Sequence, residues 1–295
     1  MLFKKIPMFS LFFLLTIFAF NSRADEKAIN GADNRTEMFK APIAIQNLSP
    51  SIAGHFLKDS LSKRGNDYTV ASGTIGEKHC SSVRFADQYI GPRCTGFLIA
   101  PNLIATAAHC MNEQGDCEKY FWIFDYQLKS SGDKSYTKIP TEKVYSCKKI
   151  YSIKYEYFNG LDYALVELDR AVLNRPLLAI DFFADTTAGL PIFMIGHPSG
   201  LPLKYTDGAA VTKDLEHAFE TDLDIFGGNS GGPIFSVLTN QVVGIASRGH
   251  ANWVTRPGAT CKSEKVCTPK DNCNPTVVAK IKFIKDDLEK FQAEN

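Results

Sequence analysis

Three short segments of this chain contain the residue types of a nucleophilic hydrolase, in the order His, Asp, Ser. His109 follows a run of small residues, ATAA, which leaves room for an imidazole to face a cleft. Asp162 begins an apolar run, and Ser230 lies in the sequence GGNSGGP. Glycines on both sides of Ser230 allow backbone conformations that turn N–H groups toward one point. The three residues could therefore supply a nucleophile, a base and a carboxylate that orients the base.

The elements that position these residues are predicted to be short strands. From about residue 80 onward, short apolar runs are separated by Gly, Pro, Asn and Asp, which is typical of an all-β sandwich or barrel. Near the C-terminus, Val277, Ile281, Ile284 and Leu288 recur at about every fourth position. This spacing predicts a C-terminal α-helix over residues 276–292.

The first 24 residues have the pattern of a signal peptide. Lys4 and Lys5 precede an apolar run, and Ser22-Arg23-Ala24 has the small-x-small form of a cleavage site. The run is shorter than the roughly 20 residues that span a membrane, so a retained anchor is the less favoured alternative. We expect an exported protein, secreted or periplasmic, that makes no membrane contact after signal removal. Residues 25–70 are polar and weakly patterned, and we expect an N-terminal arm or pro-segment there.

Net charge and cysteine content argue against two classes of protein, those that bind nucleic acid and those that hold a metal. Removal of Lys4, Lys5 and Arg23 with the signal changes the formal net charge from +1 to −2. A nearly neutral chain without basic clusters indicates no nucleic-acid partner. The eight cysteines form no C-x-x-C pair, and their even number in an exported chain favours disulfides over a metal site. We expect a monomer with no metal and no cofactor.

The three segments together resemble the trypsin-like serine endopeptidases of the chymotrypsin fold. The motifs that carry this resemblance are TAAHC, LDYALVELD and GGNSGGP. The resemblance extends from about residue 80 to about residue 249. The chain order of the motifs is that of the chymotrypsin type. Within that family the chain is most similar to the bacterial branch that includes the V8 and other glutamyl endopeptidases. The resemblance implies two six-stranded antiparallel β-barrels, at about 71–180 and 181–275, within a protease domain over 71–295.

The resemblance also assigns roles to individual residues. Ser230 Oγ attacks the scissile carbonyl, His109 accepts and then returns the proton, and Asp162 orients His109. The backbone N–H groups of Gly228 and Ser230 bind the oxyanion, where loss of one donor typically costs about 3–4 kcal/mol. The family spacing further implies a disulfide between Cys94 and Cys110, while the other six cysteines leave fifteen pairings open.

Position 229 departs from the animal members of the family. It is Asn, whereas those enzymes have an Asp that pairs with the new N-terminal ammonium after activation cleavage. An amide cannot form that ion pair, which argues against activation by N-terminal insertion. Trimming of residues 25–70 for other reasons stays open, with Lys63-Arg64 as a candidate site.

Substrate preference has three open interpretations. Asp224 lies six positions before Ser230, where animal trypsins have the carboxylate that selects Arg or Lys, although a solvated turn would also explain it. Arg248 and His250 would instead favour acidic side chains, but Ala246 stands where glutamyl endopeptidases have a histidine. A broad preference is the third interpretation. In each case backbone groups of Ser247 and Gly249 are expected to pair with an extended substrate.

The expected function is therefore an exported serine endopeptidase that hydrolyses protein or peptide substrates through an acyl-enzyme. The alternative is a protease-fold binding protein that is catalytically silent. That alternative usually requires loss of a triad residue, and all three residues are present in this chain.

Overall fold

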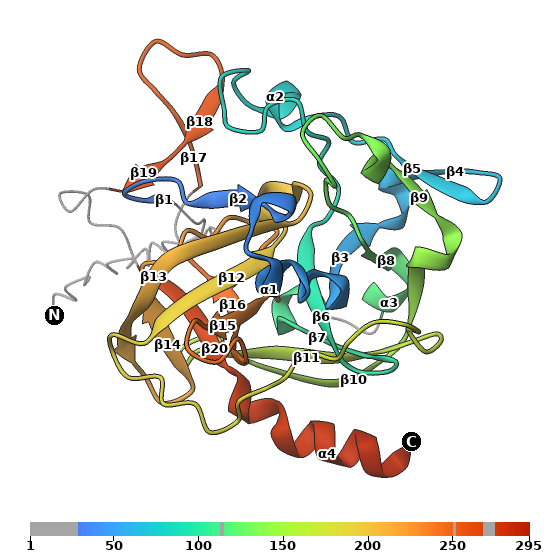
Figure 1. The fold of residues 1–295 in the computed structure, drawn as a ribbon, viewed down its shortest axis with the longest axis vertical. Coiled ribbons are helices and arrows are strands. Elements are labelled where there is room, and N and C mark those ends of the chain that lie inside the picture. Colours follow the sequence, from blue (N-terminus) through green and yellow to red (C-terminus); the bar gives the residue numbers. More distant parts are fainter. Residues whose placement is uncertain (1–28, 113–114, 250–251, 268–274) are drawn as a thin grey trace, which may run out of the picture.

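The computed structural model describes residues 29–112, 115–249, 252–267 and 275–295. Two antiparallel barrels lie side by side, the first on the right and the second on the left of Figure 1. The first barrel closes in the order β10-β11-β7-β6-β3-β8. Its strands are β3 (Ile52–Leu57), β6 (Cys94–Ala100), β7 (Leu103–Thr106), β8 (Tyr120–Phe124), β10 (Val144–Glu156) and β11 (Leu161–Leu168). All seven residues of β6 and all eight of β11 are buried, which explains why their sequences are mostly apolar.

The second barrel also has six strands, because β12 pairs with both β15 and β13 and so closes the ring β12-β15-β16-β20-β14-β13. The two predicted six-stranded antiparallel barrels are thus confirmed. The strands are β12 (Pro191–Gly196), β13 (Lys204–Asp214), β14 (Ala218–Thr221), β15 (Pro233–Ser236), β16 (Val242–Arg248) and β20 (Thr276–Lys280). One apolar cluster contains residues of both barrels, including Leu165 of the first and Phe235 of the second. This cluster is a hydrophobic core that the two barrels share.

The N-terminal part of the chain is built into both barrels, which corrects the expected arm over residues 25–70. Strand β3 is a full member of the first barrel, paired with β6 and β8. Strand β2 (Arg35–Glu37) extends the second barrel by pairing with β13, and α1 (Ile43–Gln46) connects the two regions. The first barrel consequently begins at Ile52 and not near residue 71. Residues 1–28, which include the predicted signal peptide, lie outside the described residues.

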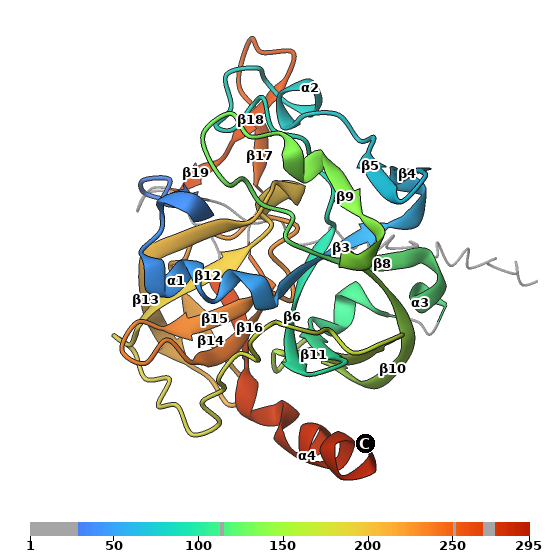
Figure 2. The ribbon, with the colours of Figure 1, turned by 45° about the vertical axis from the view of Figure 1, so that its right-hand side comes forward.

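The C-terminal helix is shorter than predicted. Residues Thr276–Lys280 form β20, which pairs with β14 and β16, and only Lys285–Glu294 form the helix α4. Adjacent valines at 277 and 278 favour a strand, so the four-residue spacing that began at Val277 was misleading. Helix α4 lies below both barrels in Figures 1 and 2, and Leu288 and Phe291 are buried in the shared core.

Smaller elements surround the barrels. A ribbon of β17 (Trp253–Thr255) and β18 (Lys262–Glu264) lies beside α2 (Ile75–Lys78) in both views (Figures 1 and 2). The other short elements are β1 (Ile29–Asn30), β4 (Leu61–Arg64), β5 (Asp67–Val70), β9 (Lys138–Pro140), β19 (Val266–Cys267) and α3 (Asp116–Lys119). None of the helices in the described ranges is long and apolar enough to cross a membrane.

Candidate active site

The predicted triad residues come from both barrels. His109 lies in a short 3-10 turn (Ala108–Cys110) directly after β7, and Asp162 is the second residue of the neighbouring strand β11. Ser230 lies in the loop that leads into β15 of the second barrel. Since β7 pairs with β11, the fold of the first barrel by itself brings His109 to Asp162. The second barrel must then supply the serine.

The Asp162 carboxylate is buried and accepts three hydrogen bonds. Oδ2 lies 2.7 Å from His109 Nδ1, and Oδ1 accepts the backbone N–H of His109 at 3.1 Å. The third donor is the Ser247 hydroxyl, 2.5 Å from Oδ2. Burial alone would raise the pKa of Asp162, but the hydrogen bonds and charge of His109, together with the Ser247 bond, lower it below its ordinary value. The carboxylate is therefore held ionised beside the imidazole, whose side chain is 32% exposed.

Ser247 also connects this pair to Ser230. The Ser230 hydroxyl donates to the carbonyl oxygen of Ser247 at 3.3 Å, while the Ser247 hydroxyl donates to Asp162. The sulfur of Cys110, the residue after His109, lies 3.7 Å from the carbonyl oxygen of Ser230. The structure thus gathers the three predicted residues in one place between the barrels.

Thr95 holds the loop around Ser230 against the first barrel. Its hydroxyl donates to the carbonyl oxygen of Gly228 at 2.7 Å, and its N–H donates to that of Ser230 at 2.8 Å. The peptide unit that carries the N–H of Gly228 is held as well, because the Gly227 carbonyl accepts the N–H of Ser199 at 2.5 Å. That of the Ser230 N–H is held at the Asn229 carbonyl, which accepts the N–H of Gly232 at 2.9 Å. Within the described part of the chain, the N–H of Gly228 donates to no backbone acceptor. That N–H is available to a ligand.

Gly228 occupies a position that only glycine fits. Its φ is +95°, in the left-handed region, and a Cβ there would lie 2.3 Å from the carbonyl oxygen of His197 and 2.9 Å from the nitrogen of Gly200. His197 is itself fixed, because its N–H donates to the Thr95 hydroxyl. Burial lowers the pKa of His197 to about 3, so this histidine is neutral and structural.

A cavity of about 340 Å³ borders Gly228. Asn252 forms part of its wall and braces the loop, since its Oδ1 accepts the N–H of Gly227 at 2.8 Å and its Nδ2 donates to the Ile225 carbonyl at 3.1 Å. The residues that line the cavity are His79, Pro92, Arg93, Ser199, Gly200, Gly227, Gly228, Asn252 and Trp253. None of the described residues that line it carries a carboxylate, and Arg93 contributes a positive charge.

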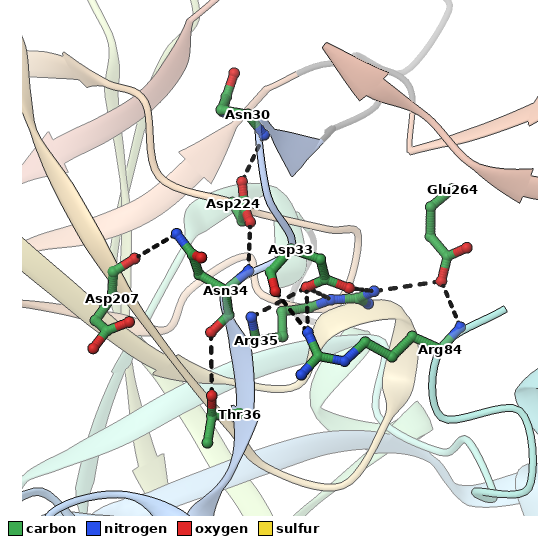
Figure 3. Close-up of polar contacts among 9 residues, drawn as sticks. All are labelled: Asn30, Asp33, Asn34, Arg35, Thr36, Arg84, Asp207, Asp224 and Glu264. Atoms are coloured by element: carbon green, nitrogen blue, oxygen red, sulfur yellow. Dashed lines mark hydrogen bonds and ion pairs between the residues drawn. The ribbon is translucent and has the colours of Figure 1, made fainter. Parts of the chain in front are cut away.

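Asp224 does not line this cavity. Its side chain is buried, and its two oxygens accept the backbone N–H groups of Asn30 at 2.6 Å and Asn34 at 3.1 Å (Figure 3). Burial raises the pKa of Asp224 to about 6, against the effect of these two hydrogen bonds. Because both oxygens bind the N-terminal segment, the interpretation of Asp224 as a substrate-selecting carboxylate is corrected, and so is that of a solvated turn.

The other two predicted substrate-binding residues, Ser247 and Gly249, lie at the C-terminal end of strand β16. Ser247 lies where the pairing with β20 is irregular, between Ala246 and Arg248, and Gly249 is buried directly after the strand. The side-chain bond from Ser247 to Asp162 was not predicted, nor were the roles of Thr95 and Asn252. These bonds join residues 25 to 133 positions apart, and no local motif signals them.

The cysteines near the site form disulfides. Cys94 and Cys110 are bonded, as the resemblance implied, and the structure adds Cys80–Cys261 and Cys117–Cys147. Ligand atoms of Cys94, His109 and Cys110 lie within 4.8 Å of one another. Both sulfurs are bound to each other, however, and a metal requires a thiolate.

Two antiparallel six-stranded barrels with a His–Asp pair and a glycine-framed serine between them define the chymotrypsin-like class of peptidases. The family model for the trypsin-like peptidase domain matches residues 94–245, and the chain belongs to that family.

Solved structures of two proteases are similar. A Glu endopeptidase, determined in complex with MPD, is 19% identical over 90% of this chain and 100% of its own, with a TM-score of 0.52. The VesB protease of Vibrio cholerae is 19% identical over 90% of this chain and 68% of its own, with a TM-score of 0.50. At this identity the likeness shows a shared fold. A comparison with curated proteins gives no match.

Proposed function

We propose that this trypsin-like peptidase is a serine endopeptidase in which Ser230 is the nucleophile, His109 the general base and Asp162 the residue that orients the base. The observation that carries the proposal is the 2.7 Å contact between His109 Nδ1 and the buried, ionised Asp162 carboxylate. That contact leaves Nε2 of His109 to accept the proton of the Ser230 hydroxyl. The attack gives a tetrahedral intermediate, which collapses to an acyl-enzyme as the C–N bond breaks and the amine leaves with the proton held by His109. Water, deprotonated by His109, then hydrolyses the ester and returns the proton to Ser230.

The N–H groups of Gly228 and Ser230 are proposed to bind the oxyanion of the tetrahedral intermediate. The N–H of Gly228 shares a peptide unit with the Gly227 carbonyl, which accepts the N–H of Ser199. The N–H of Ser230 shares one with the Asn229 carbonyl, which accepts the N–H of Gly232, so both donors are positioned before substrate arrives. Preorganised donors of this kind stabilise charge that develops only in the transition state. They therefore raise kcat more than they strengthen substrate binding.

Substrates are proposed to be extended peptides that pair with the backbone of Ser247 and Gly249 and pass Ser230 toward the cavity beside Gly228. Selection of Arg or Lys through Asp224 is not part of the proposal, since that carboxylate is buried against Asn30 and Asn34. Export to the cell exterior or periplasm is proposed on the sequence pattern of the first 24 residues and on the three disulfides among the described residues. A monomeric state is also proposed.

Incubation of the purified chain with a peptide library, followed by mass spectrometry, tests the proposal. We expect cleavage by the wild type and none by Ser230→Ala, with Ser236→Ala, a buried serine of β15, as the control that keeps activity. A wild type that binds peptides but cleaves none would instead support the silent binding protein. The cleavage sites also report specificity, and we expect Asp224→Asn to leave the preferred residue before the cut unchanged.

A further inference from the structure

The N-terminal segment Ile29–Glu37, here called the N-terminal clasp, lies against the chain that leads to Ser230. Its backbone N–H groups at Asn30 and Asn34 occupy both oxygens of Asp224, 2.6 and 3.1 Å away (Figure 3). These contacts join residues 194 and 190 positions apart. A buried carboxylate whose two oxygens each accept a backbone donor fixes both chains with respect to each other.

A second contact forms between the next residue of the clasp, Arg35, and Phe226, which lies two residues after Asp224. Arg35 is fully buried, and its guanidinium lies over the Phe226 ring, 4.0 Å from the ring centre. Asp33 holds the guanidinium by two bonds, at 2.9 and 2.7 Å, and Glu264 lies 3.4 Å from it. Figure 3 shows this ion cluster beside the Asp224 contacts. A cation desolvated on an aromatic face in this way interacts strongly.

The clasp and Asn252 hold residues 224–227 through alternate positions. The side chains of Asp224 and Phe226 contact the clasp, while Asn252 bonds the backbone of Ile225 and Gly227. The carbonyl oxygen of Phe226 in turn accepts the N–H of Asn229 at 3.0 Å. The turn that contains Gly228 is therefore bonded to the backbone of a residue, Phe226, whose side chain the clasp holds.

We propose that Asp224 and Arg35 are positioning residues of the peptidase, which act through this turn to place the N–H of Gly228 and the hydroxyl of Ser230. The proposal rests on the function proposed above. It further requires that the active protein retains the clasp, so any processing of the N-terminus ends at or before Ile29. Since Asn229 cannot form the ion pair of animal trypsins, the clasp supplies a hold on the same loop through internal residues of the chain.

The ion cluster offers a matched control. Arg84 belongs to it, because its guanidinium lies 3.0 Å from Asp33 Oδ1 and its backbone N–H donates to Glu264. Its side chain is 42% exposed, whereas that of Arg35 is fully buried. Within the described parts of the chain Arg84 bonds Asp33 and Glu264 and none of residues 223–229. Replacement of Arg84 removes the same charge from the same cluster without a direct effect on the turn.

The experiment measures kcat and KM of the full chain on one peptide substrate, with the melting temperature of each variant. We expect Asp224→Asn and Arg35→Met to lower kcat by about 10-fold or more and to change KM by less than about 3-fold, because a displaced donor weakens the transition state more than the bound substrate. Arg84→Met is expected to stay within about 2-fold in both constants. If Arg35→Met does not fold, Asp33→Asn is used in its place. It weakens the hold on the Arg35 guanidinium while the side chain at position 33 keeps its shape.

Unchanged kcat in folded Asp224→Asn and Arg35→Met would overturn the proposed positioning role. So would an equal loss of kcat in Arg84→Met, or a change in KM alone. A wild type that hydrolyses nothing would instead overturn the proposed function. N-terminal sequencing of fluorophosphonate-labelled protein is an independent check. We expect a sequence that begins at or before Ile29, and labelled protein that begins after Glu37 would refute the proposal.

Discussion

Replacement of Gly228 by alanine tests the oxyanion site most sharply. At φ +95° an alanine costs about 1–2 kcal/mol in backbone strain. The added Cβ would also lie 2.3 Å from the backbone carbonyl oxygen of His197, which has little freedom to move because Thr95 and Leu201 bond this residue. The turn itself must therefore shift. A misplacement of about 1 Å at such a site typically costs about 100-fold in rate, and we expect kcat to fall by about that factor.

Gly189→Ala is the matched control for this variant. Gly189 has a φ of +96°, but no atom lies within 4 Å of the position of its Cβ. The control therefore has the same backbone strain without the collision, and it should lose a few degrees in melting temperature while keeping kcat. Steady-state kinetics and thermal unfolding of both variants provide the comparison. A folded Gly228→Ala protein with kcat within about 3-fold of the wild type would refute the proposed role of this N–H.

Three further predictions concern the surroundings of the site. Ser247→Ala removes a hydrogen bond to the Asp162 carboxylate, worth about 1.5–3 kcal/mol, and should lower kcat about 10-fold in steady-state assays. Asp224 has a folded pKa of about 6 against 3.8 in the unfolded chain, so the native state binds its proton more tightly. Relative to Asp224→Asn, the wild-type free energy of unfolding should therefore rise as the pH falls from 7 to 4, by up to about 3 kcal/mol in denaturant titrations. Joint replacement of Cys94 and Cys110 by alanine opens a disulfide with a sequence separation of 16 and should cost about 3 kcal/mol in the same titrations.

Each of these predictions has a contradicting outcome. Ser247→Thr keeps the hydroxyl and should retain most activity, so an equal loss in both variants would assign the effect to packing. A difference between wild type and Asp224→Asn that does not change with pH would place the carboxyl pKa near its ordinary value. Unchanged stability of the double cysteine variant would show that the loop is held by its other contacts.

The barrel strands could be predicted where their sequences are mostly apolar, as in β6 and β11. Strand β3 was missed because its sequence, IAGHFL, contains a glycine and a histidine. In the structure His55 is buried between the rings of Tyr120 and Trp122, 4.1 and 4.5 Å away, and burial lowers its pKa to about 3. In the sequence a histidine counts as a polar residue, which argues against a buried strand. Here it packs as a neutral aromatic ring, and that depends on the residues of the barrel around it.

In the candidate site, too, some residues could be predicted from local motifs and others could not. His109, Asp162 and Ser230 lie in local motifs whose residue types signal their chemistry, and the structure brings them together. Asp224 also lies at a motif position, yet its partners are Asn30 and Asn34, in a segment that carries no signal of its own. An ungapped count along the chain gives a residue its position but not the direction of its side chain. That direction depends on which distant strand packs beside it.

The nucleophile is tested most directly by the site of covalent modification. The purified wild-type chain is treated with a fluorophosphonate, digested and mapped by mass spectrometry, alongside His109→Ala and Asp162→Asn. The account predicts one phosphonylated residue, Ser230, in the wild type, with labelling slowed by orders of magnitude in both variants. Absence of label on Ser230 in folded wild-type protein, or equal labelling of Ser230 without His109, would contradict it.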